Sequence, residues 1–180
     1  MDGRFRPTPD DKGYTIHPPD PVTMKSVSPY LNFPGNSEEA FNFYKSVFGG
    51  EPVITRFKDL QDNSMGVPER DLDKIANIAL PLGSGCVLMA TDVIDSMPTQ
   101  LTVGNNFYIT LEPESIEEAE SLFNALAEGG AIEMPLMKTE WAEKYGICAD
   151  KFGIQWMINY GGNVEAGCVE EETEGANAAV

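Results

Sequence analysis

An internal repeat of about 80 residues limits the folds that this chain can adopt. The segment SEEAFNFYKSVFGGE at 37–51 is echoed by IEEAESLFNALAEGGA at 116–131, with one residue of slip between the Glu-Glu-Ala and the Gly-Gly. The segments VLMAT at 87–91 and QWMIN at 155–159 match as well. Repetition on this scale indicates that one structural unit of the chain occurs twice.

The first copy predicts the order strand, helix and three strands. A helix opens at Asn36 or Ser37, either of which can cap it, and its first turn carries glutamates that suit the positive end of the helix dipole. Its apolar face has helical spacing, and Gly49-Gly50 ends it. The expected strands are 26–33, 51–58, 74–82 and 85–91, and the expected apolar face is Ala40, Phe43, Tyr44 and Val47.

The second copy predicts the same order. Ser115 caps the second helix, Gly129-Gly130 ends it, and the expected strands are 105–112, 131–137, 145–151 and 154–160. We therefore expect one α+β domain at 24–160, made of two βαβββ modules at 24–91 and 104–160. Their half-covered sheets should form an eight-stranded mixed sheet around a cavity, with the helices outside.

The two ends of the chain differ from this repeat in composition. Residues 1–23 hold five of the 13 prolines, and residues 161–180 hold five glutamates and no lysine or arginine. Both segments lack apolar periodicity, so we expect a disordered leader and a disordered acidic tail. The leader could be native or a remnant of expression, and Met24 would make a natural start.

Charge and composition exclude several classes of function. Twelve Lys and Arg face 29 Asp and Glu, for a net charge of −17, of which the tail contributes −5. This acidity argues against nucleic acid and anionic membranes as partners. No apolar run is long enough for a membrane span and no signal peptide is visible, so the three cysteines indicate free thiols in the cytoplasm. The single histidine, His17, lies in the leader.

Three segments resemble a known family: SPYLNFPGNSEEAFNFYKSVFGGE, LMATD and WAEKYGICADKFGIQWMINY. They are similar to the PhnB-like branch of the vicinal oxygen chelate superfamily, which contains glyoxalases, bleomycin resistance proteins and dioxygenases. The resemblance implies eight strands around a ligand cavity and a homodimer. Some members carry a methyltransferase label, but the sequence has no glycine-rich strand-to-helix nucleotide loop.

The superfamily's metal ligands can be carried over position by position. The matching residues are Ser28, Met89, Phe107 and Met157, and Asn77 stands where many PhnB-like sequences have histidine. A hydroxyl, two thioethers and a phenyl ring are poor ligands for Zn²⁺, Ni²⁺, Fe²⁺ or Mn²⁺. We therefore expect no metal site and no cofactor.

Alternation along the strands predicts which other side chains share the cavity. Tyr30 and Asn32 follow Ser28, Ile109 follows Phe107, and Gln155 and Asn159 flank Met157, while Leu31 and Phe33 face a helix. Trp141 and Tyr145 could form a lid or a dimer contact. Asp92 and Asp95 are interpreted as linker polarity and Asp150 as a turn residue. The pocket candidates are Ser28, Tyr30, Asn32, Asn77, Met89, Phe107, Trp141, Tyr145, Gln155 and Met157.

Three functions remain open at this point. The first is a metal-independent protein that binds a small molecule, either cationic, as the acidic core would favour, or aromatic. The second is a metal-independent lyase or isomerase of the glyoxalase type, whose base would be Asp, Glu or Tyr. The third is a dimeric interaction module with a vestigial pocket.

Overall fold

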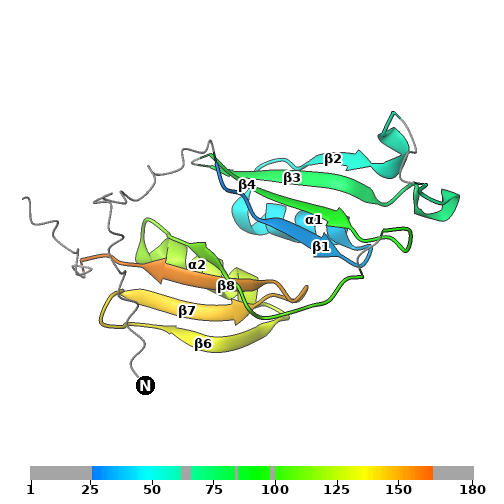
Figure 1. Ribbon diagram of the computed structural model, residues 1–180. Helices are drawn as coiled ribbons and strands as arrows, with labels where there is room; N and C mark the ends of the chain where they lie inside the picture. The colour runs from blue at the N-terminus through cyan, green and yellow to red at the C-terminus, as the bar shows by residue number, and fades with distance from the viewer. Residues whose placement is uncertain (1–25, 62–65, 84, 98–99, 164–180) are drawn as a thin grey trace, which may run out of the picture.

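The computed structural model describes residues 26–61, 66–83, 85–97 and 100–163, and it confirms the repeated βαβββ order (Figure 1). The predicted leader and most of the predicted tail lie outside the described residues. The first module is β1 (Tyr30–Phe33), α1 (Ser37–Phe48), β2 (Val53–Arg56), β3 (Ile75–Gly83) and β4 (Cys86–Asp92), with 3-10 turns at Phe57–Asp59 and Glu69–Asp71. The second is β5 (Ile109–Leu111), α2 (Ile116–Ala127), β6 (Ala131–Met137), β7 (Lys144–Ala149) and β8 (Gln155–Tyr160).

The eight strands form two mixed sheets of four, ordered β1-β4-β3-β2 and β5-β8-β7-β6. In each sheet the first strand pairs parallel with the last, and the remaining pairs are antiparallel. Tyr30 lies opposite Met89 in the first sheet, and Thr110 lies opposite Met157 in the second. The α+β class and the two modules are therefore as predicted, but the strands are divided between two sheets.

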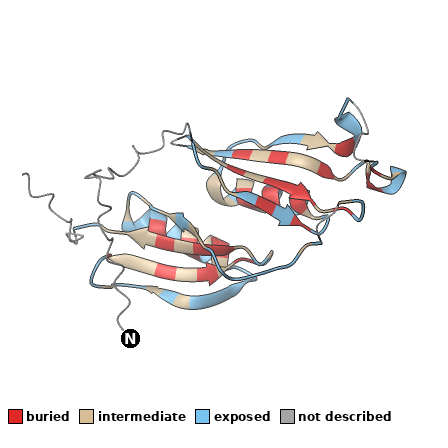
Figure 2. Cartoon of the chain, viewed as in Figure 1, coloured by how far each residue is buried: buried red, intermediate tan, exposed pale blue. Residues whose placement is uncertain are grey.

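The larger of two hydrophobic clusters in the described residues contains side chains of both modules, and the two helices touch each other as well as their own sheets. Figure 2 shows buried residues on strands of both modules. Leu31 and Phe33 are buried on the helix side, as the alternation predicts. Helix α1 buries Phe41 in addition to the predicted face, and Trp156 of β8 is fully buried against α1. Burial of apolar area across the junction stabilises the modules as one unit.

Asp150, in the turn between β7 and β8, joins the modules by hydrogen bonds. One carboxylate oxygen accepts from the backbone N–H groups of Phe152 at 2.8 Å and Ile154 at 3.0 Å, which fits the predicted turn role. The other accepts from the Tyr44 hydroxyl at 2.8 Å and the Trp156 indole N–H at 2.9 Å. The buried carboxylate is thus fully hydrogen-bonded, which offsets its desolvation cost.

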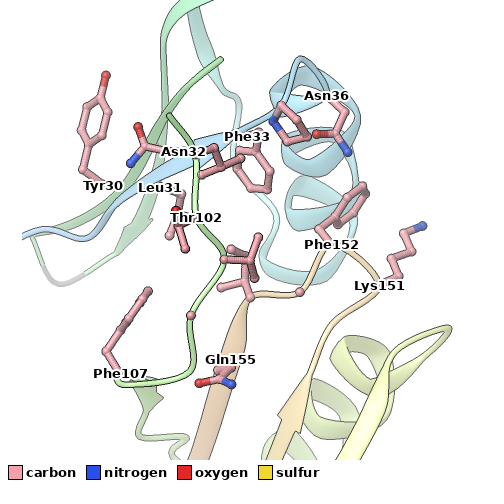
Figure 3. Close-up of a pocket in the computed structure, with 16 residues that line it drawn as sticks. Tyr30, Leu31, Asn32, Phe33, Asn36, Thr102, Phe107, Lys151, Phe152 and Gln155 are labelled. Carbon is pink, nitrogen blue, oxygen red and sulfur yellow. The ribbon is translucent and has the colours of Figure 1, made fainter. Parts of the chain in front are cut away.

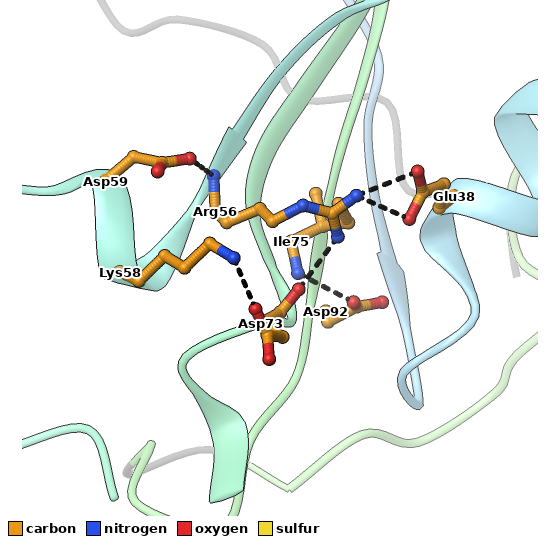
Figure 4. A network of polar contacts seen from close by, with 7 residues as sticks. All are labelled: Glu38, Arg56, Lys58, Asp59, Asp73, Ile75 and Asp92. Atoms are coloured by element: carbon orange, nitrogen blue, oxygen red, sulfur yellow. Dashed lines mark hydrogen bonds and ion pairs between the residues drawn. The ribbon is translucent and has the colours of Figure 1, made fainter. Parts of the chain in front are cut away.

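The start of α1 differs from the prediction. The side chain of Asn36 makes no capping hydrogen bond, and Asp92 at the end of β4 accepts from the N–H and Oγ of Ser37 at 2.9 and 2.6 Å. Asp92 also accepts from the Ile75 N–H at 2.9 Å and is 2% exposed, so its assignment to linker polarity was wrong (Figure 4). Beside it, Arg56 makes two hydrogen bonds to Glu38, both at 2.9 Å, linking β2 to α1.

Candidate functional site

The face of the first sheet away from α1 carries several predicted pocket residues. Tyr30 on β1 donates a hydrogen bond from its hydroxyl to Oδ1 of Asn77 on β3 at 3.2 Å, and Met89 lies opposite Tyr30 on β4. Partial burial raises the pKa of the Tyr30 phenol above its ordinary value. Ser28 precedes β1 and is half-buried. The structure therefore brings Tyr30, Asn77 and Met89 together on one open sheet face.

The corresponding face of the second sheet carries another group of predicted residues. The Tyr145 hydroxyl lies 3.4 Å from the sulfur of Met157, and the ring of Trp141 packs edge-on against Tyr145 with centroids 5.4 Å apart. Nearby, the Tyr108 hydroxyl donates to Glu133 at 2.9 Å, and this hydrogen bond raises the pKa of the Tyr108 phenol. Trp141 is 50% exposed, so this aromatic group is open to solvent in the single chain.

The predicted alternation along β5 was wrong by one residue. Thr110, not Ile109, lies opposite Met157, and its hydroxyl is 3.7 Å from the sulfur, whereas Ile109 packs against the core. The reason is that β5 begins only at Ile109, so Phe107 lies in the irregular segment before it. Counting back from Thr110 makes Tyr108, and not Phe107, the counterpart of Ser28.

A pocket of about 360 Å³ lies between the modules, beside β1 and the turn before β8 (Figure 3). Four predicted residues line it: Tyr30, Asn32, Phe107 and Gln155. The other six lie outside its lining: Ser28, Asn77, Met89, Trp141, Tyr145 and Met157. Two lining segments, the linker at 101–104 and the turn at 151–154, were not predicted, because residues between strands carry no periodic signal.

The pocket combines apolar walls with neutral polar groups. Gln155 is only 9% exposed and its Oε1 has no hydrogen-bond partner, and the buried Oδ1 of Asn36 is also unpaired. The only charged group among the described lining residues is Lys151, whose ammonium lies over the rings of Phe43 at 4.6 Å and Phe152 at 5.3 Å. Unpaired buried amide oxygens are costly unless a bound molecule satisfies them.

The residues present do not fit the superfamily's metal. The thioethers of Met89 and Met157 are poor donors for hard or borderline divalent ions, and the sulfur of Met157 already faces two hydroxyl groups. Within the described ranges, no three His, Cys, Asp or Glu side chains gather as a metal site would require. Burial, with smaller contributions from Asp150 and Glu133, raises the pKa of the Cys148 thiol to about 11 and thus disfavours the thiolate that metals bind.

Taken together, two βαβββ modules with an intermodule pocket define a glyoxalase-like α+β protein. The family model described as 3-demethylubiquinone-9 3-methyltransferase matches residues 25–159, so the chain belongs to that family. This is the PhnB-like branch of the vicinal oxygen chelate superfamily, whose more distant members share the fold at low identity. The predicted family membership is confirmed.

Three relatives illustrate the similarity. Protein YjdN of Escherichia coli K12 is 31% identical over 141 residues, covering 74% of this chain and 93% of YjdN. The crystal structure of PA1353 from Pseudomonas aeruginosa is 38% identical with a TM-score of 0.67, covering 76% of this chain and 98% of its own. A PhnB protein from Bacillus cereus is 29% identical with a TM-score of 0.54, covering 76% and 99%. Across the described residues, none of the helices is of a length and apolarity that would cross a membrane.

Proposed function

We propose that this protein binds a small molecule in the pocket between its modules, without a metal ion. The observation that carries the proposal is Gln155, a nine-tenths-buried amide whose Oε1 has no partner and which lines a cavity of about 360 Å³. Aromatic and aliphatic walls around a few polar groups are typical of sites for small ligands. The prediction of a cationic or an aromatic ligand therefore stays open at this point.

We further propose that the protein acts as a homodimer. The open sheet faces expose large apolar side chains in the single chain, among them Trp141 at 50% and Met137 at 48%. Exposed apolar surface of this kind is typical of protein interfaces, and a second copy is the partner that the family resemblance implies. In such a dimer Trp141 and Tyr145 would lie at or near the contact, which is one of their two predicted roles.

The alternative function is a metal-independent lyase or isomerase. One observation favours it: the Tyr108 hydroxyl and the Glu133 carboxylate are hydrogen-bonded at 2.9 Å on the open face of the second sheet. A carboxylate that shares a proton with a phenol could serve as an acid–base pair toward a substrate held between two copies. A Glu133→Gln variant that retained full turnover would exclude this role.

The test compares ligand binding by metal-free protein with binding by two matched variants. Protein treated with a chelator is screened for thermal stabilisation by small molecules, and the affinity of each hit is measured by calorimetry. Gln155→Leu should weaken binding about tenfold or more, because it removes the buried amide. Asn159→Leu is the control, since Asn159 is also an unpaired amide on β8 but lies outside the pocket. Binding that appears only after a divalent metal is added would overturn the proposal.

A further inference from the structure

We infer that the intermodule pocket selects a neutral, planar molecule with an adjacent N–H and C=O, such as a lactam, which pairs with the free edge of β1. This inference rests on the proposed function, because it names the ligand class of the same pocket. The inferred ligand class excludes the cationic ligand that the acidity of the chain favoured. Three features of the pocket support it: an unpaired strand edge, a linker that leaves this edge open, and the absence of a countercharge for a cation.

The first feature is the strand edge. β1 is the outermost strand of its sheet, and it bonds to β4 through alternate residues, as the hydrogen bonds from Met89 N–H to Pro29 C=O at 3.2 Å and from Val93 N–H to Phe33 C=O at 2.7 Å indicate. In a parallel ladder the intervening residues turn their N–H and C=O groups the other way. Tyr30 and Asn32 therefore present two donors and two acceptors on the side of β1 where the pocket lies.

The second feature is the linker that passes along this edge. Residues 101–104 line the pocket together with β1, yet none of the backbone hydrogen bonds among the described residues joins them to β1 or to any other segment. The linker therefore covers the pocket without pairing with the strand. An unpaired edge is a template for another hydrogen-bonding chain or molecule, because its N–H and C=O groups alternate with fixed spacing.

The third feature is the charge of the lining. No aspartate or glutamate is among the described residues that line the pocket, so a cation would find no countercharge there. The ammonium of Lys151 lies over the rings of Phe43 and Phe152, and in Figure 3 Lys151 is on the far side of Phe152 from Tyr30 and Phe107. The remaining lining groups are neutral amides, the hydroxyl groups of Tyr30 and Thr102, and apolar walls. A buried amide such as Gln155 binds best to a neutral partner with its own N–H.

The test uses four compounds that share one bicyclic ring system, titrated into the full chain by calorimetry. They are carbostyril, a neutral lactam; N-methylcarbostyril, which lacks the N–H; N-methylquinolinium, a cation; and quinaldate, an anion. We expect carbostyril to bind, N-methylcarbostyril to bind roughly fivefold to tenfold more weakly, and the two ions to bind more weakly still. The backbone amide signals of Tyr30 and Asn32 should shift in nuclear magnetic resonance spectra as carbostyril is added.

Two pairs of variants locate the contact. Asn32→Pro and Asn32→Ala both remove the side-chain amide, but only Asn32→Pro also removes an edge N–H that β4 does not use. Asn32→Pro should therefore weaken carbostyril binding more than Asn32→Ala does. Gln155→Leu should weaken binding and Asn159→Leu should not. If Asn32→Pro does not fold, the methylated compound and the amide signals still decide the question.

The possible results separate the two proposals. Stronger binding of the cation or the anion than of carbostyril would overturn the inferred ligand class while leaving a metal-free small-molecule pocket in place. Equal binding of carbostyril and its N-methyl derivative, or unchanged signals of Tyr30 and Asn32, would overturn the edge contact. Failure of all four compounds to bind would overturn the inferred ligand class, and the screen of small molecules with metal-free protein would still decide whether the pocket binds a ligand.

Discussion

The hydrogen bond from Tyr44 to Asp150 is expected to contribute strongly to stability, and Tyr44→Phe removes it with little other change. Tyr44 is fully buried and its hydroxyl lies 2.8 Å from the carboxylate, so water does not replace the lost donor. A hydrogen bond to a charged group is worth about 1.5–3 kcal/mol. We therefore expect the free energy of unfolding to fall by about 2 kcal/mol and Tm to fall by roughly 5–10 °C.

Asp150→Asn extends the test because the amide has nearly the same shape as the carboxylate. If the amide oxygen retains the bonds to the turn N–H groups, the amide nitrogen faces the Trp156 indole N–H, which loses its acceptor. We expect a loss of about 2–4 kcal/mol. Since Tyr44 and Asp150 are in contact, the double variant should lose less than the sum of the single losses, by about 1–2 kcal/mol.

The assay is urea unfolding followed by tryptophan fluorescence, and the matched control is Tyr108→Phe. Tyr108 also donates to a carboxylate, but on an exposed sheet face where water can take over the bond. The control should cost less than about 0.5 kcal/mol. A cost for Tyr44→Phe no larger than the cost for Tyr108→Phe, or strictly additive effects of the Tyr44 and Asp150 variants, would refute the reasoning.

Three further predictions concern buried groups, each checked by urea unfolding. Asp92→Ala leaves three buried donors unpaired and should lower the free energy of unfolding by about 3–5 kcal/mol. Asp95→Ala removes only a surface ion pair and should lower it by less than about 1 kcal/mol. Similar losses for the two variants would contradict the capping role of Asp92. Gly146→Ala would place its Cβ 2.9 Å from a phenylalanine ring and should cost about 1–3 kcal/mol, while Gly104→Ala, with no contact closer than 3.7 Å, should be nearly neutral. The folded-state pKa of Cys148 is raised to about 11. The contribution of the protonated Cys148 thiol to the free energy of unfolding is therefore complete below about pH 9 and is lost as the pH rises toward 11. From pH 9 to 10 the wild type should lose about 1 kcal/mol more stability than Cys148→Ser, and parallel curves would contradict this.

The order and approximate bounds of the elements followed from local patterns in the sequence. The apolar spacing of residues such as Ala40, Tyr44, Ala119 and Phe123 predicted both helices, and β6 agrees with its predicted range of 131–137. The Ser115 cap was also predictable, because the Ser115 side chain accepts from the Glu118 N–H three residues later. Caps between residues close in the sequence and the spacing of apolar residues can therefore be predicted directly from the sequence.

The long-range contacts could not be predicted in this way. Asp92 caps a helix that begins 55 residues before it, and Asp150 accepts from a tyrosine 106 residues before it. Nothing near either aspartate in the sequence distinguishes a buried acceptor from surface polarity. Likewise, four of the ten pocket candidates line the pocket and six lie outside it, and the strand period alone could not distinguish the two groups.

The contact between Tyr44 and Asp150 also gives the two halves of the repeat unequal roles. In the aligned repeats Phe123 stands at the position of Tyr44, so only the first helix carries the hydroxyl group. The partner carboxylate belongs to the second module alone, because the shorter turn between β3 and β4 has no aspartate. Two copies of the first module would bring two phenols and no acceptor, and two copies of the second would bring two carboxylates and no phenol. Recognition at this contact is therefore heterotypic, and it favours the association of one half with the other over the association of either half with itself.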